Sequence, residues 1–231
     1  MSHFTAIISS RRPDRVPEMQ RHAPDCTWFV GNGEANDYRM NGAIKVVESG
    51  GLCESRNAAL ETAFKQGLPC VQLSDDLKSI KKAHDKKNIE PYSLNKACKE
   101  MLHLGKTYKA KLVGVAPTAN AFYYNPLQPF KQKAFIVGDM IMVFPCDHRF
   151  DENLLLKEDY DFTLKHLQKE GKVLRVNFIL AEFAHRTNKG GAVSYRTSML
   201  EKTCIAYLKR KWGKLIRDNP RRPDEILLNL K

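Results

Sequence analysis

The stretch from Gly51 to Ile80, GLCESRNAALETAFKQGLPCVQLSDDLKSI, is the part of the sequence that decides the fold prediction. Its first half predicts a helix over residues 54–66, because small apolar side chains recur at helical spacing and a glycine follows. Its second half predicts a buried strand over residues 70–73, which stops at the polar triplet Ser74-Asp75-Asp76. Ligands of open α/β sheets bind at the carboxyl ends of the strands. The triplet is therefore placed where a ligand would bind.

Two adjacent carboxylates repel each other unless they are solvated, paired with a base or neutralised by a cation. Side chains alternate along a strand, so we expect Asp76 to suit direct contact with a metal ion and Asp75 to face the other way, towards a ribose hydroxyl or a basic residue. Arg56 and Asn57 lie just upstream on the predicted helix. We interpret the stretch as a site for a divalent metal and a nucleotide diphosphate. A solvent-exposed turn is the alternative, since Ser-Asp-Asp is also good turn composition.

The rest of the chain continues the alternation of strands with helices or loops that is typical of a parallel α/β sheet. We predict one domain over residues 1–231, an open, mainly parallel sheet flanked by helices, with a basic helix and tail from about residue 194. The lysine-rich segment 78–87 is expected to be solvated and mobile, and the tail 217–231 to be partly unstructured. Further strands are predicted at 4–8, 26–30, 43–47, 112–115, 135–144 and 173–183, and further helices at 93–103, 160–169 and 195–212.

The charge of the chain is strongly positive. It has 231 residues, with 38 Lys and Arg against 26 Asp and Glu, a net charge of +12. Such an excess favours polyanionic partners, with nucleic acid the first candidate and an anionic membrane surface the second. A generally basic surface without a polyanionic partner is the alternative.

Six cysteines are widely scattered, without a CxxC pair, and several lie in apolar runs. This pattern predicts a reducing compartment, with neither a disulfide framework nor a zinc site. The start of the chain does not read as a signal peptide, and the longest apolar stretch, residues 135–145, is interrupted by Asp139 and is too short to span a bilayer. We therefore expect a soluble protein of the cytoplasm.

A second acidic cluster, Glu158, Asp159 and Asp161, stands at the predicted start of a helix. Carboxylates are stabilised there by exposed N–H groups and by the helix dipole, so capping is one adequate explanation. Three carboxylates in four positions are more than capping needs. The functional interpretation makes one of them a general base that removes a proton from an acceptor hydroxyl.

A third group of residues, AHRTNKGG at 184–191, follows a predicted strand. Its glycines and cations could wrap phosphates, which makes Lys189 and Gly190 candidate donor contacts. His185 could complete a metal shell or touch the diphosphate. A structural histidine is the alternative interpretation.

Weaker candidates lie elsewhere in the chain. Ser9 and Arg11 follow the first strand, where the base and ribose of a nucleotide would lie in an α/β sheet. Tyr123 and Tyr124 belong to an aromatic loop that could stack a nucleobase, and Arg196 stands beside the basic C-terminal helix. For the aromatic residues, ordinary packing is the alternative.

Taken in order, these motifs resemble a known family. ESRNAAL (54–60), VQLSDD (71–76), KEDYDFTL (157–164) and NKGG (188–191) are similar to motifs of glycosyltransferases of the GT-A type. More closely, they resemble the glycosyltransferases associated with TET/JBP-type DNA dioxygenases, which include bacteriophage members and relatives of the base J glucosyltransferase. The resemblance covers roughly residues 4–196.

The resemblance implies transfer of glucose from UDP-glucose to the hydroxymethyl group of 5-hydroxymethylcytosine or 5-hydroxymethyluracil in DNA. It implies Mn²⁺ or Mg²⁺ as cofactor, a functional link to a TET/JBP-type dioxygenase, and the host cytoplasm as location if the chain is phage-encoded. A carboxylate base on the acceptor side suggests inversion at the anomeric carbon. The residues that it implicates are Asp76 and His185 for the metal and the diphosphate, Arg56, Asn57 and Asp75 for the donor, and Glu158, Asp159 and Asp161 for the acceptor.

One departure from the family pattern concerns the acidic motif. The first position of the usual Asp-x-Asp is Ser74 here, which bears on the ribose contact of Asp75 and on metal affinity. Three other functions remain open: a non-catalytic basic module that binds nucleic acid, a metal-dependent nuclease, and a glycosyltransferase with an acceptor other than DNA.

Overall fold

The structure is a computed structural model that describes residues 2–184, 190–222 and 225–230. Within these residues, eight strands form the main sheet, and five further strands form two small sheets. The main-sheet strands are β1 (Phe4–Ile8), β2 (Thr27–Val30), β3 (Lys45–Glu48), β4 (Cys70–Ser74), β7 (Leu112–Val115), β8 (Phe130–Lys131), β9 (Met140–Val143) and β10 (Leu174–Val176). The others are β5 (Leu77–Ala83), β6 (Ile89–Pro91) and β11 (Ile179–Phe183) in one small sheet, and β12 (Ile216–Asp218) and β13 (Ile226–Leu228) in the second.

In the described part of the chain, six α-helices connect or cover the strands. They are α1 (Val16–His22), α2 (Ala35–Met40), α3 (Leu52–Lys65), α4 (Leu94–Thr107), α5 (Glu158–Glu170) and α6 (Ser198–Trp212). Short 3₁₀ turns stand at η1 (Pro13–Arg15), η2 (Ala121–Tyr123), η3 (Gly191–Ser194) and η4 (Gly213–Leu215). None of the described helices is long and apolar enough to cross a lipid bilayer.

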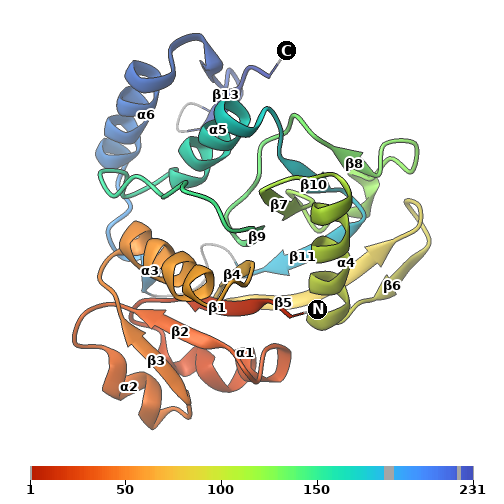
Figure 1. The fold of residues 1–231 in the computed structure, drawn as a ribbon. Helices are drawn as coiled ribbons and strands as arrows, with labels where there is room; N and C mark the ends of the chain where they lie inside the picture. The colour runs from red at the N-terminus through yellow and green to blue at the C-terminus, as the bar shows by residue number, and fades with distance from the viewer. Residues whose placement is uncertain (1, 185–189, 223–224, 231) are drawn as a thin grey trace.

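The main sheet has the strand order β3-β2-β1-β4-β9-β7-β10-β8 (Figure 1). The half formed by β3, β2, β1 and β4 is parallel throughout, and β7 and β10 are parallel to each other. Strands β9 and β8 run antiparallel to their neighbours. The α/β class predicted from the sequence, a large sheet flanked by helices, is confirmed. The parallel half brings the carboxyl ends of β1 and β4 side by side, with Ile8 opposite Ser74.

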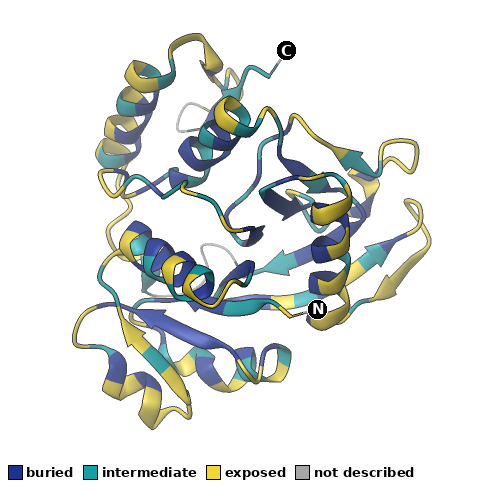
Figure 2. Ribbon diagram, in the orientation of Figure 1, coloured by how far each residue is buried: buried dark blue, intermediate teal, exposed yellow. Residues whose placement is uncertain are grey.

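Side chains alternate between the two faces of the main sheet along its central strands, so each face has its own hydrophobic core. Ile7 and Leu73 face one core, whereas Ala6, Ile8 and Cys70 face the other. On the second face, α3 contributes its apolar residues and α5 contributes Phe162. Figure 2 shows the buried central strands between helices whose outer surfaces are exposed.

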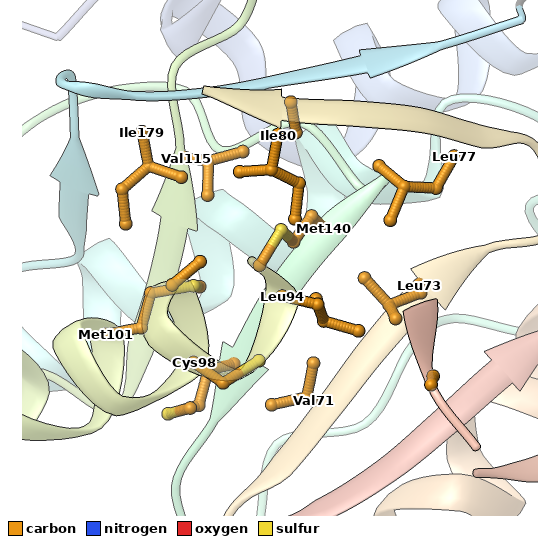
Figure 3. Packing of buried hydrophobic residues seen from close by; sticks show 14 of the residues in the cluster. Val71, Leu73, Leu77, Ile80, Leu94, Cys98, Met101, Val115, Met140 and Ile179 are labelled. Carbon is orange, nitrogen blue, oxygen red and sulfur yellow. The ribbon is translucent and has the colours of Figure 1, made fainter. Parts of the chain in front are cut away.

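The opposite face is covered by α1, α2, α4 and the sheet of β5, β6 and β11. Figure 3 shows this packing, in which Cys98 and Met101 of α4 meet Val71 and Met140 of the main sheet. A third cluster joins α5 to α6 and to the hairpin of β12 and β13. Helix α5 is therefore packed from two sides, which fixes the position of its N-terminus.

Two segments differ from the prediction. Residues 78–83 of the segment predicted to be mobile, 78–87, belong to strand β5, which buries Leu77, Ile80 and Ala83; Lys78 and Lys81 are exposed, and Lys82 is half-buried beside Glu100. The single strand predicted over 173–183 is two strands in different sheets, because the chain turns at residues 177–178. In the tail, β12 and β13 pair as a hairpin that packs Ile216 and Ile226 against α6, and the other described residues of the tail form neither helix nor strand.

Candidate functional site

A cavity of about 790 Å³ lies at the carboxyl ends of β1 and β4. Its volume falls within the range of small-molecule sites, ~300–1,000 Å³. The N-termini of α3 and α5 open into it, and the segment from Gly191 to Arg196 borders it. The residues predicted from the sequence that line the cavity are Ser9, Arg56, Asp75, Asp76, Glu158, Asp159 and Arg196.

Asp75 is buried at one wall of the cavity and is held by two partners. It accepts a hydrogen bond from Arg12 Nη1 at 2.8 Å and another from the Ser9 hydroxyl, which also contacts the Tyr38 hydroxyl. Burial raises the pKa of Asp75 above its ordinary value, and the nearby Arg12 guanidinium opposes that rise. Of the two partners expected for Asp75, the structure provides the basic residue. Asp75 therefore positions Arg12 in the cavity wall.

The glycines at the start of the described C-terminal part pack closely on this loop. Arg12 Nη2 donates to the carbonyl oxygen of Gly190 at 3.0 Å, and the N–H of Gly191 donates to that of Ser10 at 2.9 Å. Gly190 has φ +86°, and a Cβ there would lie 2.7 Å from the carbonyl oxygen of Arg11. Both the backbone conformation and the close approach require glycine at this position. The predicted donor residue Gly190 is thus beside the loop that follows β1.

Arg56 is the buried centre of the opposite wall. Its guanidinium donates to Gln72 Oε1 and to the carbonyl oxygen of Gly138, each at 3.1 Å, and Nε lies 3.3 Å from Glu158 Oε1. It also lies over the ring of Phe150, 5.2 Å from the ring centroid. A single side chain of α3 thereby ties together β4, the approach to β9 and the first turn of α5.

Acidic groups gather around the space between these walls. Asp76 follows β4, Asp139 precedes β9, and Glu158 and Asp159 begin α5. Ser74 bonds the Asp139 region twice: its N–H donates to the Asp139 carbonyl at 2.9 Å and its hydroxyl to Asp139 Oδ1 at 3.3 Å. Ser74 therefore positions Asp139.

Asp159 has a pKa that is shifted towards neutrality. Burial, together with the nearby charges of Glu158 and Asp139, raises the pKa of Asp159 from 3.8 to about 7. The guanidinium of Arg56 and the N–H of Gly138, 3.3 Å from Oδ2, oppose the rise. A carboxylate with a pKa near neutrality accepts a proton more effectively than an ordinary one.

Arg196 lines the cavity and is held in place by a buried carboxylate of α6. Glu201 accepts from Arg196 Nη1 at 2.7 Å, and Lys157 Nζ lies 2.6 Å from its other oxygen. Lys157 itself lines the cavity and precedes α5 with φ 64°, a left-handed conformation. The basic C-terminal helix thus places one arginine at the rim.

Besides Gly190, five described residues that were predicted for the site do not line the cavity. Arg11 has φ 57°, and the chain turns so that Arg12 enters the wall instead. Asn57 is buried and holds the Phe150 backbone, accepting from its N–H and donating to its carbonyl oxygen. Tyr124 is buried in the core, and Tyr123 is exposed; both line a separate cavity of about 180 Å³.

Asp161 is the fifth of these residues. It is fully buried, one turn from the start of α5, and accepts from Trp212 Nε1 at 2.8 Å. Lys211 and Lys165 complete its surroundings with ion pairs of 2.8 and 3.0 Å. Asp161 thereby holds α6 against α5. One of the three carboxylates at the start of α5 is therefore explained by a structural role and needs no role in catalysis. His185 and Lys189 lie outside the described residues.

The cavity residues that the sequence does not single out as site residues include Arg12, Gly138 and Asp139. The signal for Asp139 was present, because a lone carboxylate interrupts the apolar stretch 135–145. A charge within a buried strand run requires a partner or a function. Arg12 had no such signal, since four polar residues in a row after β1 give no indication of which one turns inward.

A divalent cation such as Mg²⁺ needs several oxygen ligands within bonding distance of one point. Among the described residues, the carboxylates of the cavity do not form a group of three ligands within reach of one ion. Mg²⁺ is usually held by one or two carboxylates together with substrate phosphates and water. Asp76 and Asp139 supply hard oxygen ligands of that kind, so the residues fit a cation that is completed by a diphosphate.

Gly138→Ala is expected to disrupt the wall of the cavity that is centred on Arg56. A Cβ at Gly138 would lie 2.8 Å from Arg56 Nη2, so the guanidinium must leave the Gly138 carbonyl. Overpacking of this kind costs about 1–3 kcal/mol, and we expect a lower melting temperature in a thermal unfolding scan. Gly51→Ala is the control, because its Cβ would meet Glu54 Oε2 at an ordinary 3.4 Å. Equal melting temperatures for the two variants would contradict the role of Gly138.

The chain was compared with protein-family models and with curated proteins. No family model matches it, and no curated protein matches it. The function is therefore argued from the geometry of the cavity.

Proposed function

We propose that the protein is a metal-dependent glycosyltransferase of the GT-A type, which uses a nucleotide sugar as donor. The observation that carries the proposal is one cavity, at the ends of β1 and β4, that contains Asp76, Asp139 and the high-pKa carboxylate Asp159 together with Arg12 and Arg56. Ligand binding at this edge of a parallel sheet is the general rule for open α/β folds.

The donor would occupy the side of the cavity formed by the loop after β1 and the start of α3. The N-terminus of this 14-residue helix carries partial positive charge, which favours an anionic diphosphate. Arg12 adds a cation on the same side. When bound, a divalent cation held by Asp76 and Asp139 would neutralise charge on the leaving diphosphate.

Asp159 is the proposed base for the acceptor. It would remove the proton of the acceptor hydroxyl as that oxygen forms a bond to the anomeric carbon, while the bond from that carbon to the diphosphate oxygen breaks. The electron pair of the broken bond leaves with the nucleoside diphosphate. Attack opposite to the leaving group inverts the anomeric configuration.

DNA that carries a hydroxymethylated pyrimidine is the proposed acceptor. The net charge of +12 favours a polyanion, and Arg196 brings a cation from the basic α6 region to the cavity rim. A link to a TET/JBP-type dioxygenase, which would make the hydroxymethyl group, belongs to the same proposal. Glucose as the sugar rests on the resemblance.

The proposal is tested by incubating the protein with Mn²⁺ and UDP-glucose, with and without DNA containing 5-hydroxymethylcytosine or 5-hydroxymethyluracil. We expect UDP release that requires the modified DNA, and a hexose-sized mass gain on the nucleoside. UDP release without transfer would support the donor site and direct the search to another acceptor. Strand scission without any donor would favour a nuclease, and DNA binding without consumption of any nucleotide sugar would favour a binding module.

The rate of transfer is expected to depend on pH through Asp159. Only the ionised carboxylate accepts a proton, so kcat/KM should fall as pH drops below about 7, tenfold per unit well below the pKa. A bound cation nearby favours the ionised form of Asp159, so saturating Mn²⁺ should shift the acidic limb of the kcat/KM profile to lower pH. The measurement is UDP release between pH 5 and 8.5 at two Mn²⁺ concentrations. A flat profile would exclude Asp159 as the base.

A further inference from the structure

A cluster of one cysteine and two histidines lies beside the C-terminal half of α5, away from the first turn of that helix, which lines the cavity. Cys146 and His148 belong to the segment after β9, and His166 belongs to α5. One ligand atom from each of the three side chains lies within 4.8 Å of the others, and Cys146 Sγ is 3.9 Å from His166 Nε2. The sequence spacing does not reveal the group, because His166 is 20 residues from Cys146 and only the fold brings it to Cys146 and His148.

Each histidine has one ring nitrogen fixed by an acceptor. His166 Nδ1 is 2.8 Å from the carbonyl oxygen of Phe162, which can only accept, so Nδ1 carries a proton; the other nitrogen, Nε2, is the one 3.9 Å from Cys146 Sγ. His148 Nε2 is 2.7 Å from Glu170 Oε1, so this nitrogen donates to the carboxylate. Histidines that bind metals almost always donate their second N–H to a carbonyl or a carboxylate in this way.

Packing explains part of the arrangement. His166 is fully buried against the ring of Phe162, with ring centroids 4.5 Å apart, and its ring also meets that of His148. Packing does not account for two imidazoles that lie next to a thiol and are each held by a hydrogen bond from one ring nitrogen. Cys146 and His148 are half-buried, so an ion could reach the group from solvent.

We propose that Cys146, His148 and His166 form a Zn²⁺ site. A thiolate with two imidazoles is a ligand set that zinc favours over Mg²⁺ or Ca²⁺. Zn–S and Zn–N bonds of ~2.3 and ~2.0 Å place tetrahedral ligand atoms roughly 3.6 Å apart, close to the observed separation of Sγ and Nε2. Binding converts the thiol to a thiolate and releases its proton to solvent.

The expected role of the site is structural. The ion would clamp the segment after β9 onto the C-terminal half of α5, about two turns from Asp159 along that helix. It is separate from the cation proposed at Asp76 and Asp139, whose oxygen ligands favour Mg²⁺ or Mn²⁺. The inference stands without the proposed function, because none of its three ligands lines the cavity.

The test uses the full chain, stripped with a chelator and titrated with Co²⁺ as a spectroscopic substitute for Zn²⁺. We expect one Co²⁺ per chain with a thiolate-to-metal charge-transfer band that Zn²⁺ abolishes, and a Zn²⁺-dependent rise in melting temperature. Cys146→Ser should lose the charge-transfer band. His148→Gln should raise the Kd for Zn²⁺ by about 100-fold or more, and Glu170→Gln, which removes only the support of His148, by about 10–100-fold.

His84→Gln is the matched control. His84 also contacts a carboxylate, Glu90 at 3.2 Å, but this exposed pair belongs to no Cys/His group among the described residues. The variant should bind Zn²⁺ like the unmodified protein. A protein that develops no thiolate band with Co²⁺, or a band that persists in Cys146→Ser, would overturn the proposal. Both observations are independent of catalytic activity.

Discussion

Asp159→Asn is expected to reduce turnover by about 10²–10⁴-fold, the usual contribution of a positioned general base, while donor binding is retained. The substitution preserves the shape of the side chain, and the amide can still accept from the N–H of Gly138. It removes the proton acceptor alone. The measurements are kcat from UDP release with acceptor present, and the Kd of UDP by calorimetry.

The same variant should not be less stable than the unmodified protein. The pKa of Asp159 rises from 3.8 to about 7 on folding, so the folded state holds a proton that the unfolded state has lost. Stability of the unmodified protein is therefore lost as pH rises from about 4 to 7 and is constant above that range. Asparagine does not ionise, so its relative gain in melting temperature should grow over the same interval. A kcat within threefold of the unmodified protein would exclude Asp159 as the base.

Asp161→Asn separates catalysis from structure on the same helix. Asp161 contacts Trp212, Lys211 and Lys165 and does not line the cavity. Loss of its charge removes the carboxylate partner of Lys165 and one of the two carboxylate partners of Lys211, the other being Asp151, and we expect a loss of stability of about 1–3 kcal/mol. The kcat of the remaining folded protein should change little. A collapse of kcat equal to that of Asp159→Asn would show that the acidic cluster acts as a unit.

The sequence predicted which strands and helices form the site better than it predicted which side chains line it. The positions of β1, β4, α3 and α5 follow from local patterns of apolar residues, and these four elements carry Ser9, Arg56, Asp76 and Asp159 to one cavity. The clearest failure is the segment 78–87, which was predicted to be mobile although most of it belongs to β5. Buried residues recur at every third position of β5, a period that matches neither a strand nor a helix.

Contacts between distant parts of the chain could not be predicted. The choice between Arg11 and Arg12 depends on one left-handed residue, and Asp161 is structural because Trp212, 51 residues later, donates to it. Asp139 enters the site through its bonds with Ser74, 65 residues earlier. These pairings depend on the order of strands in the main sheet, which no local pattern specifies.

Asp76→Asn is expected to abolish the dependence of donor binding on Mn²⁺ and to lower kcat/KM by about 10²–10³-fold. Loss of cation stabilisation of a leaving diphosphate costs several kcal/mol, and each 1.36 kcal/mol is tenfold in rate. Asp76 is buried, and its carbonyl oxygen accepts from the N–H of Ala184, a backbone bond that the substitution leaves in place. The measurements are Mn²⁺ binding by electron paramagnetic resonance and UDP release.

Asp75→Asn is the matched control, because it removes the same charge one residue away. Asp75 is held by Arg12 and Ser9, so its loss should lower the melting temperature, since a buried charge pair is broken. Mn²⁺ binding should persist, because the proposed ligands Asp76 and Asp139 remain. If the two variants lost Mn²⁺ affinity equally, the general negative field of the cavity, rather than ligation by Asp76, would explain the binding. Unchanged Mn²⁺ affinity in Asp76→Asn would remove Asp76 as a ligand and leave Asp139 as the carboxylate to test.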